Sequence, residues 1–217
     1  MEIELWNYYR SSTSYRVRIA LHLKGISYTY RPVHLLKNGG EQHQEAFRKL
    51  NPLGEVPCLV HGTHIVSQSL AILSYLENLQ PNPPIFPQDP YLRAKAWQLA
   101  EGINSGIHPL TNLKVLKHLE KNWHLDESEK QNWQQKWIQD GFFAFEKSLQ
   151  DLSGRYCIGD LVSAADICLI PQLFSARRYG VDLQSFPKIR RIEENCLKLD
   201  AFQRAHPERQ PDAPKAP

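Results

Sequence analysis

A run of polar residues near the N-terminus, Arg10-Ser11-Ser12-Thr13-Ser14-Tyr15-Arg16, is the densest polar cluster of the chain. It follows a segment whose apolar and polar residues alternate as in a strand, and it precedes an amphipathic segment typical of a helix. Backbone N–H groups at a helix N-terminus stabilise an anion, and hydroxyls there can donate to a thiolate and lower its pKa. The same residues would also serve as an ordinary helix cap. The cluster therefore indicates either a cap or an anion site.

Two further motifs lie where predicted elements begin. Val56-Pro57 opens a strand, and a cis bond there would turn the Val56 N–H and C=O outward to pair with an extended peptide. Gln68-Ser69 opens a helix and again offers N–H groups to an anion. Alone, each motif is equally typical of a turn proline or a helix cap. Together with the hydroxyl cluster they favour a bound anionic ligand.

Other kinds of chemistry find little support in the sequence. Cys58, Cys157, Cys168 and Cys196 include no C-x-x-C pair, so we expect buried, unreactive thiols. The histidines lack metal-ligand spacing, so we expect no metal site, and no nucleotide-binding glycine motif occurs.

A net charge of +3 on 217 residues argues against nucleic acid as a partner. No apolar run reaches the roughly 18 residues of a membrane span and no secretory signal pattern is present, so we expect a cytoplasmic protein that does not bind membranes.

The elements that position these motifs alternate through the first 80 residues. The predicted order is β-α-β-α-β-β-α, with strands at 3–8, 28–33, 56–60 and 64–66 and helices at 12–24, 44–50 and 67–79. A proline-rich stretch at 81–90 is typical of a linker. Beyond it apolar residues recur with helical spacing, and Ser163 to Asp166 form a predicted capping box. We expect a helical domain over 91–217 with a frayed, proline-rich tail.

Six blocks occur in this order along nearly the whole chain: YYRSSTSYRVRIALHLKG, NPLGEVPCL, QSLAILSYLE, GIHPLTNLKVL, GDLVSAADICLIPQ and HPERQPD. They resemble the zeta class of glutathione transferases, whose best-known members are maleylacetoacetate isomerases. The first and fifth blocks are the specific ones. The resemblance implies an α+β, thioredoxin-like N-terminal domain that binds glutathione (1–80), an all-α C-terminal domain (91–217) and a homodimer. It also implies glutathione as the cofactor.

Carried over by position, the family's glutathione site falls on the motifs described above. Ser11, Ser12 and Thr13 would lie at the sulfur, with Ser12 as the first choice for the hydroxyl that donates to the thiolate. The other positions that would hold glutathione are Ser14, Tyr15, Arg16, Gln42, Val56, Pro57, Gln68, Ser69, Asn112, Leu113 and Lys114.

Three further residues complete the catalytic set that the resemblance implies. The substrate is a dianion, so guanidinium groups are expected near it. Arg10 immediately precedes the hydroxyl cluster, and Arg178 falls where related enzymes place a carboxylate-binding arginine. His108 would polarise a carbonyl or contact glutathione, and the alternative is a structural role. We also expect the helix over 91–123 to bend near His108.

Thr13 departs from the pattern of many zeta sequences, which have cysteine there. The reaction does not need a protein thiol, because glutathione supplies the nucleophile that opens the substrate's double bond to rotation. Bacterial maleylacetoacetate and maleylpyruvate isomerases of the class also lack this cysteine.

The resemblance implies conversion of maleylacetoacetate to fumarylacetoacetate in tyrosine and phenylalanine catabolism. A maleylpyruvate isomerase is an alternative, as is a transferase that conjugates or dehalogenates small electrophiles at the same site. A non-catalytic interaction module with this fold is disfavoured, because it would have no need to keep the hydroxyl cluster and Gln68-Ser69.

Overall fold

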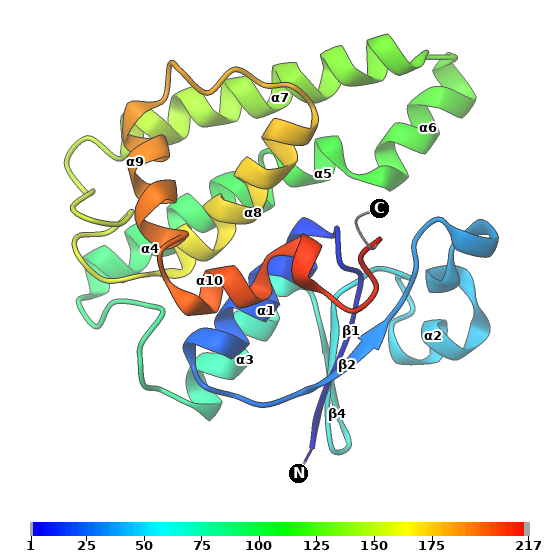
Figure 1. The fold of residues 1–217 in the computed structure, drawn as a ribbon, viewed down its shortest axis with the longest axis horizontal. Helices are drawn as coiled ribbons and strands as arrows, with labels where there is room; N and C mark the ends of the chain where they lie inside the picture. The colour runs from blue at the N-terminus through cyan, green and yellow to red at the C-terminus, as the bar shows by residue number, and fades with distance from the viewer. Residues whose placement is uncertain (1, 215–217) are drawn as a thin grey trace. The chain divides into compact units, whose positions relative to one another are not determined.

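The computed structural model describes residues 2–214, and the chain divides into two compact units (Figure 1). The first unit combines Met1–Pro84 with Lys198–Pro217, of which 2–84 and 198–214 are described. The second unit is Ile85–Leu197. The three motifs of the predicted site all belong to the first unit.

The first unit is built on a four-stranded mixed sheet with the order β2-β1-β3-β4. Its strands are β1 (Ile3–Asn7), β2 (Thr29–Pro32), β3 (Cys58–His61) and β4 (His64–Ser67). The central strand β1 runs parallel to β2 and antiparallel to β3, and β3 and β4 form a hairpin. Burial alternates along β1, because successive side chains point to opposite faces of the sheet.

Helices cover both faces of this sheet. The short α2 (Glu45–Leu50) places Phe47 in a cluster with Val33 and Cys58, and Trp6 packs against that cluster. Leu5 and Leu59, which are paired in the register, are buried on the opposite face. The helices α1 (Ser12–Leu23) and α3 (Ser69–Leu79) pack against each other (Figure 1). The predicted β-α-β-α-β-β-α order and the thioredoxin-like fold class are confirmed.

The C-terminal segment corrects the expected division of the chain. Its helix α10 (Asp200–Ala205) packs along α1, where the Tyr15 hydroxyl donates to the Phe202 carbonyl oxygen at 3.4 Å (Figure 1). A 3₁₀ turn (Pro207–Arg209) follows, and Pro207 and Gln210 are buried. Residues 198–214 therefore join the first unit instead of forming the frayed end of a helical domain. The last part of the predicted tail, 215–217, lies outside the described residues.

The second unit is helical, as predicted. It contains α4 (Pro90–Asn104), α5 (His108–Thr111), α6 (Leu113–Trp123), α7 (Glu127–Ser148), α8 (Ala164–Arg178) and α9 (Pro187–Cys196). The predicted capping box is present at the start of α8, where the Ser163 hydroxyl and the Asp166 carboxylate bond at 2.9 Å. Among the described residues, no helix is both long and apolar enough to cross a membrane.

The helix expected over 91–123 is broken near His108. A short turn separates α4 from α5, and Asn112 then caps α6 by accepting a hydrogen bond from the Val115 N–H at 3.0 Å. Gly106 is required in the turn, since a Cβ there would lie 2.5 Å from the Gly102 carbonyl oxygen. The predicted bend is therefore a full interruption.

Candidate functional site

The turn between β1 and α1 presents the hydroxyl cluster at the start of α1. Ser11 is the N-cap, and its hydroxyl oxygen accepts a hydrogen bond from the Ser14 N–H at 3.2 Å. Ser12 begins the helix, where N–H groups have no partner within the helix and the dipole favours negative charge.

Thr13 joins this turn to the second motif. Its hydroxyl donates to the Val56 carbonyl oxygen at 3.1 Å and lies 2.9 Å from the Ser11 hydroxyl oxygen. A threonine hydroxyl has a single hydrogen. Because Thr13 gives that hydrogen to Val56, Ser11 must be the donor in the contact between the two hydroxyls. Both hydroxyl hydrogens are thus committed within the protein. The Val56–Pro57 bond beside them is cis, the geometry that the sequence left open.

The third motif lies at the start of α3 and is linked to α1 by a buried arginine. Arg16 is fully buried, and its Nη1 donates to the Ser69 hydroxyl oxygen at 3.1 Å. Gln68 has a φ of 71°, which is rare for a residue other than glycine, and no side chain caps this helix. The start of α3 therefore offers N–H groups beside a buried cation, which is a favourable arrangement for a carboxylate.

Two hydrogen bonds, Thr13–Val56 and Arg16–Ser69, therefore bring the three predicted motifs together in one unit. Ser14, Tyr15 and Arg16 are fully buried. Their expected contacts with glutathione remain predictions. Gln42 is also almost fully buried, in the 3₁₀ turn Glu41–His43.

Protein thiols do not provide a nucleophile in the described part of the chain. All four cysteines are free and buried there, as the sequence predicted. Cys58 is the one closest to the site along the chain, directly after Pro57, and burial raises its pKa to about 11. It is therefore protonated near neutral pH. A thiolate at this site has to come from a ligand.

Comparison with known proteins agrees with this geometry. Residues 10–79 match the family model described as glutathione S-transferase, N-terminal domain. The chain is 49% identical to the maleylacetoacetate isomerase of Mus musculus over 211 residues, which cover 97% of this chain and 94% of that protein. The chain belongs to the zeta class of glutathione transferases.

Solved structures of zeta-class relatives have the same fold. One is a maleylpyruvate isomerase, described as a bacterial zeta-class glutathione S-transferase in its holo form. It has a TM-score of 0.94 and 42% identity, and the match covers 97% of this chain and all of that one. Another is the maleylacetoacetate isomerase of Methylobacterium extorquens, solved with malonate and glutathione bound. Its TM-score is 0.92 at 39% identity, with 98% of this chain and 100% of that one covered.

The remaining predicted residues of the zeta-class site lie in the second unit. His108 begins α5, and Asn112, Leu113 and Lys114 form the junction of α5 and α6. Arg178 is the last residue of α8, is exposed, and lies over the Tyr179 ring with its guanidinium carbon 4.4 Å from the ring centroid. The expected contacts of these residues with glutathione or substrate remain predictions. In the first unit, Arg10 lies half-buried in the β1–α1 turn.

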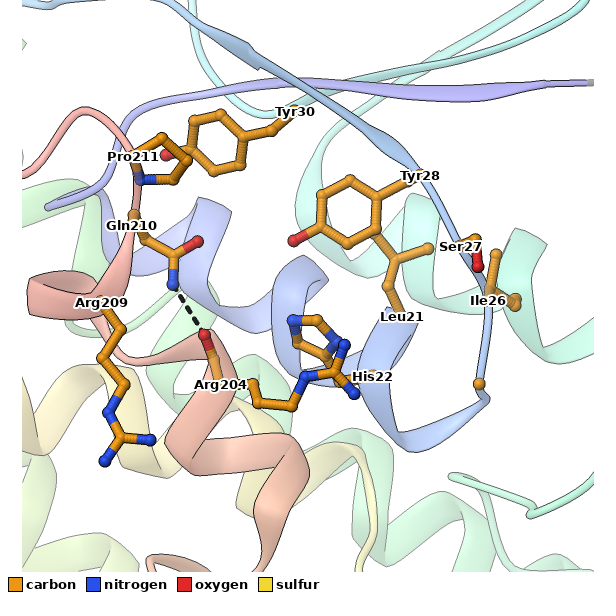
Figure 2. Close-up of a pocket in the computed structure, with 11 residues that line it drawn as sticks. Leu21, His22, Ile26, Ser27, Tyr28, Tyr30, Arg204, Arg209, Gln210 and Pro211 are labelled. Atoms are coloured by element: carbon orange, nitrogen blue, oxygen red, sulfur yellow. Dashed lines mark hydrogen bonds between the residues drawn. The ribbon is translucent and has the colours of Figure 1, made fainter.

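A hollow of about 600 Å³ in the first unit lies elsewhere (Figure 2). It is lined by residues from the C-terminal end of α1, by Tyr28 and Tyr30, and by residues of the C-terminal segment. Ser12, Val56 and Ser69 are not among the residues that line this hollow. It is therefore not part of the candidate site.

Proposed function

We propose that this zeta-class chain is a glutathione-dependent cis–trans isomerase that converts maleylacetoacetate to fumarylacetoacetate, a step in tyrosine and phenylalanine catabolism. The observation that carries the proposal is the convergence of the Ser11–Thr13 turn, the Val56–Pro57 edge and the uncapped start of α3. An anionic tripeptide thiol needs these three features, and the relative from Methylobacterium extorquens binds glutathione together with a dicarboxylate.

Three parts of glutathione have a proposed counterpart in the first unit: the cysteinyl backbone, the γ-glutamyl carboxylate and the sulfur. The Val56 backbone, before cis-Pro57, would pair with the extended backbone of the cysteinyl residue. Gln68 and the start of α3 would hold the γ-glutamyl carboxylate, and the buried Arg16 behind Ser69 adds positive potential there. The hydroxyl turn would face the sulfur. The donor set thus fits the cofactor.

When bound, glutathione supplies the thiolate whose reversible addition lets the substrate's central bond rotate. The chain's own part is to keep that sulfur ionised, to hold the carboxylates and to stabilise negative charge on a carbonyl oxygen. Ser12 is the proposed donor to the sulfur, because it is the first residue of α1. Arg10 and Arg178 are the proposed carboxylate ligands, and His108 is the proposed carbonyl-polarising group.

Maleylpyruvate is a second candidate substrate. The related maleylpyruvate isomerase has a TM-score of 0.94 to this chain, and both proposed substrates carry two anionic ends. Conjugation of small electrophiles at the same site is the third candidate. It needs the thiolate but no fixed cation for a second carboxylate.

We also propose that the chain acts as a homodimer in the cytoplasm. Large apolar side chains are exposed on each unit: Leu53 and Ile65 on the first, Tyr91 and Leu92 on the second. A contiguous patch of such side chains would be typical of an association surface. Four buried free cysteines are compatible with a reducing compartment, in which glutathione is also available.

An isomerase assay on both proposed substrates tests this function. We expect the wild-type protein to isomerise maleylacetoacetate or maleylpyruvate only when glutathione is added. Ser12→Ala should lower kcat/KM by roughly ten- to a hundredfold, because a hydrogen bond to a charged sulfur is lost. A protein that isomerises neither substrate in the presence of glutathione would contradict the proposal.

A further inference from the structure

The C-terminal segment returns to the turn that carries the hydroxyl cluster. The Asp212 carboxylate accepts a hydrogen bond from the Tyr9 N–H at 3.0 Å, across 203 positions of the chain. Its other oxygen accepts from the Tyr30 hydroxyl of β2 at a short distance. Tyr9 is separated from Ser11 by a single residue, so Asp212 acts on the backbone that leads directly into α1.

Arg18 holds the same peptide from the other side. It is fully buried, and its Nη2 donates to the Tyr9 carbonyl oxygen at 2.8 Å. Its Nε donates to the carbonyl oxygen of Ala205, at the end of α10, at 3.0 Å. Both backbone groups of Tyr9 are thus fixed, the N–H by Asp212 and the C=O by Arg18. The C-terminal segment takes part in both contacts.

The charges of this arrangement are complementary. Burying a guanidinium is costly unless a negative charge faces it. Burial lowers the pKa of Arg18, and the Asp212 carboxylate opposes that shift together with Tyr15, Tyr28 and Tyr30. Removing Asp212 would therefore weaken two supports of the turn, its own hydrogen bond to Tyr9 and the charge balance of Arg18.

The segment that carries Asp212 is itself fixed. The Gln210 side-chain amide donates to the carbonyl oxygen of Arg204 at 2.8 Å (Figure 2). It also donates to the carbonyl oxygen of His206 at 2.9 Å, and Gln210 is buried. Pro211, the residue before Asp212, lines the same hollow as Tyr30 (Figure 2). The carboxylate is thus presented to Tyr9 from a closed turn and not from a free end.

We propose that Asp212 is a positioning residue, which fixes the Tyr9 peptide and through it the orientation of Ser12 toward the sulfur of bound glutathione. This inference rests on the proposed function, because it takes the hydroxyl turn as the sulfur site. Small displacements of a hydrogen-bond donor strongly reduce its effect on a reacting group. Loss of Asp212 should therefore alter the ionisation of the bound thiol more than the binding of the rest of glutathione.

The test compares Asp212→Ala with a matched control, Glu208→Ala, which removes an exposed carboxylate from the same segment. The pKa of bound glutathione is measured from the ultraviolet absorbance of its thiolate, and its affinity by calorimetry. We expect Asp212→Ala to raise the thiol pKa by about one unit. At a pH below both pKa values, the fraction of bound glutathione present as thiolate then falls about tenfold. The substitution should lower kcat severalfold and leave the KM of the dicarboxylate nearly unchanged. Glu208→Ala should have the same thiol pKa as the wild type. Asp212→Asn keeps an oxygen acceptor for Tyr9, so its thiol pKa should lie closer to the wild-type value than to that of Asp212→Ala.

The outcomes separate the two proposals. A wild-type protein that neither binds glutathione nor isomerises the substrates would refute the function itself. A functional wild type whose thiol pKa is unchanged in Asp212→Ala would overturn the positioning role, even if that variant were less stable. Should Asp212→Ala not fold, Tyr30→Phe decides, because it removes the other partner of the carboxylate. A raised thiol pKa in Tyr30→Phe supports the role, and an unchanged one overturns it.

Discussion

Thr13 occupies the position where many zeta-class sequences have cysteine, and its hydroxyl makes contacts for which a thiol is poorly suited. It donates to Val56 and receives the Ser11 hydroxyl hydrogen, so one side chain joins the strand edge to the start of α1. A thiol is a weak donor and a weak acceptor by comparison. At this position the chain gains a rigid link between two parts of the proposed glutathione site.

Thr13→Val tests that link, because it keeps the shape of the side chain and removes the hydroxyl. We expect glutathione affinity to fall by roughly five- to tenfold, the equivalent of about one neutral hydrogen bond. Thr13→Ser keeps the hydroxyl and is the control, with an affinity close to that of the wild type. Calorimetry measures both. Equal affinities for the valine and serine variants would show that the link is dispensable.

Arg178 separates an isomerase of dianions from a general transferase. Its guanidinium is exposed over Tyr179, where it is available to a carboxylate. We expect Arg178→Ala to raise the KM of the dicarboxylate substrate by roughly ten- to a hundredfold, the value of one charge-assisted hydrogen bond. Turnover of a neutral electrophile should be nearly unchanged. Arg190→Ala, which removes an exposed arginine of α9, is the control. An equal loss of both activities in Arg178→Ala would assign the arginine a structural role.

The residue types indicated which segments of the chain form the proposed site, but they did not indicate which hydrogen bonds join those segments. Hydroxyls before a helix, a strand-initial proline and a second helix start are local patterns, and the structure joins all three. The bond between Thr13 and Val56 spans 43 positions, and neither residue carries a signal for it. The Tyr15 hydroxyl donates to the Phe202 carbonyl oxygen of α10, a partner that the sequence did not indicate.

Among the elements, α1 connects the two ends of the first unit. Its N-terminus carries the hydroxyl cluster, and His22 near its C-terminus faces the C-terminal segment (Figure 2). Burial lowers the pKa of His22 to about 4, with Arg204 and Arg18 acting in the same direction and Asp200 opposing them. The folded chain therefore favours the neutral imidazole.

This shift predicts how stability depends on pH. Between the unfolded value of about 6.5 and the folded value of about 4, the unfolded chain binds more protons at His22 than the folded chain. The free energy of unfolding should therefore decrease as the pH falls through that window. His22→Gln removes the titration and should give a smaller decrease, measured by urea unfolding across the window. Identical pH dependence in wild type and variant would show that His22 does not contribute.

Element boundaries were predictable where local signals are strong and failed where distant contacts decide. The capping box at Ser163 and Asp166 was visible from spacing alone. The tail was predicted to fray because of its prolines. Residues 198–214 instead pack on the first unit, because Pro207 and Gln210 are buried and Asp212 bonds to Tyr9 and Tyr30. Composition describes the flexibility of an isolated segment and not its tertiary contacts.

For the whole molecule, the homodimer is the first property to test. We expect light scattering at micromolar concentration to give about 50 kDa, twice the 25.1 kDa of one chain. Ile65→Glu should shift the protein toward the monomer, since it places a charge on an exposed apolar position of β4. A wild-type monomer would contradict the dimer.

In the proposed reaction glutathione acts as a cofactor of an isomerase and is not consumed. The most direct measurement is the free-thiol balance during turnover, with glutathione present at a small fraction of the substrate concentration. We expect the trans product to exceed glutathione many times over while the free thiol stays constant. Loss of one free thiol for each substrate molecule consumed would identify a conjugating transferase and contradict the proposed function.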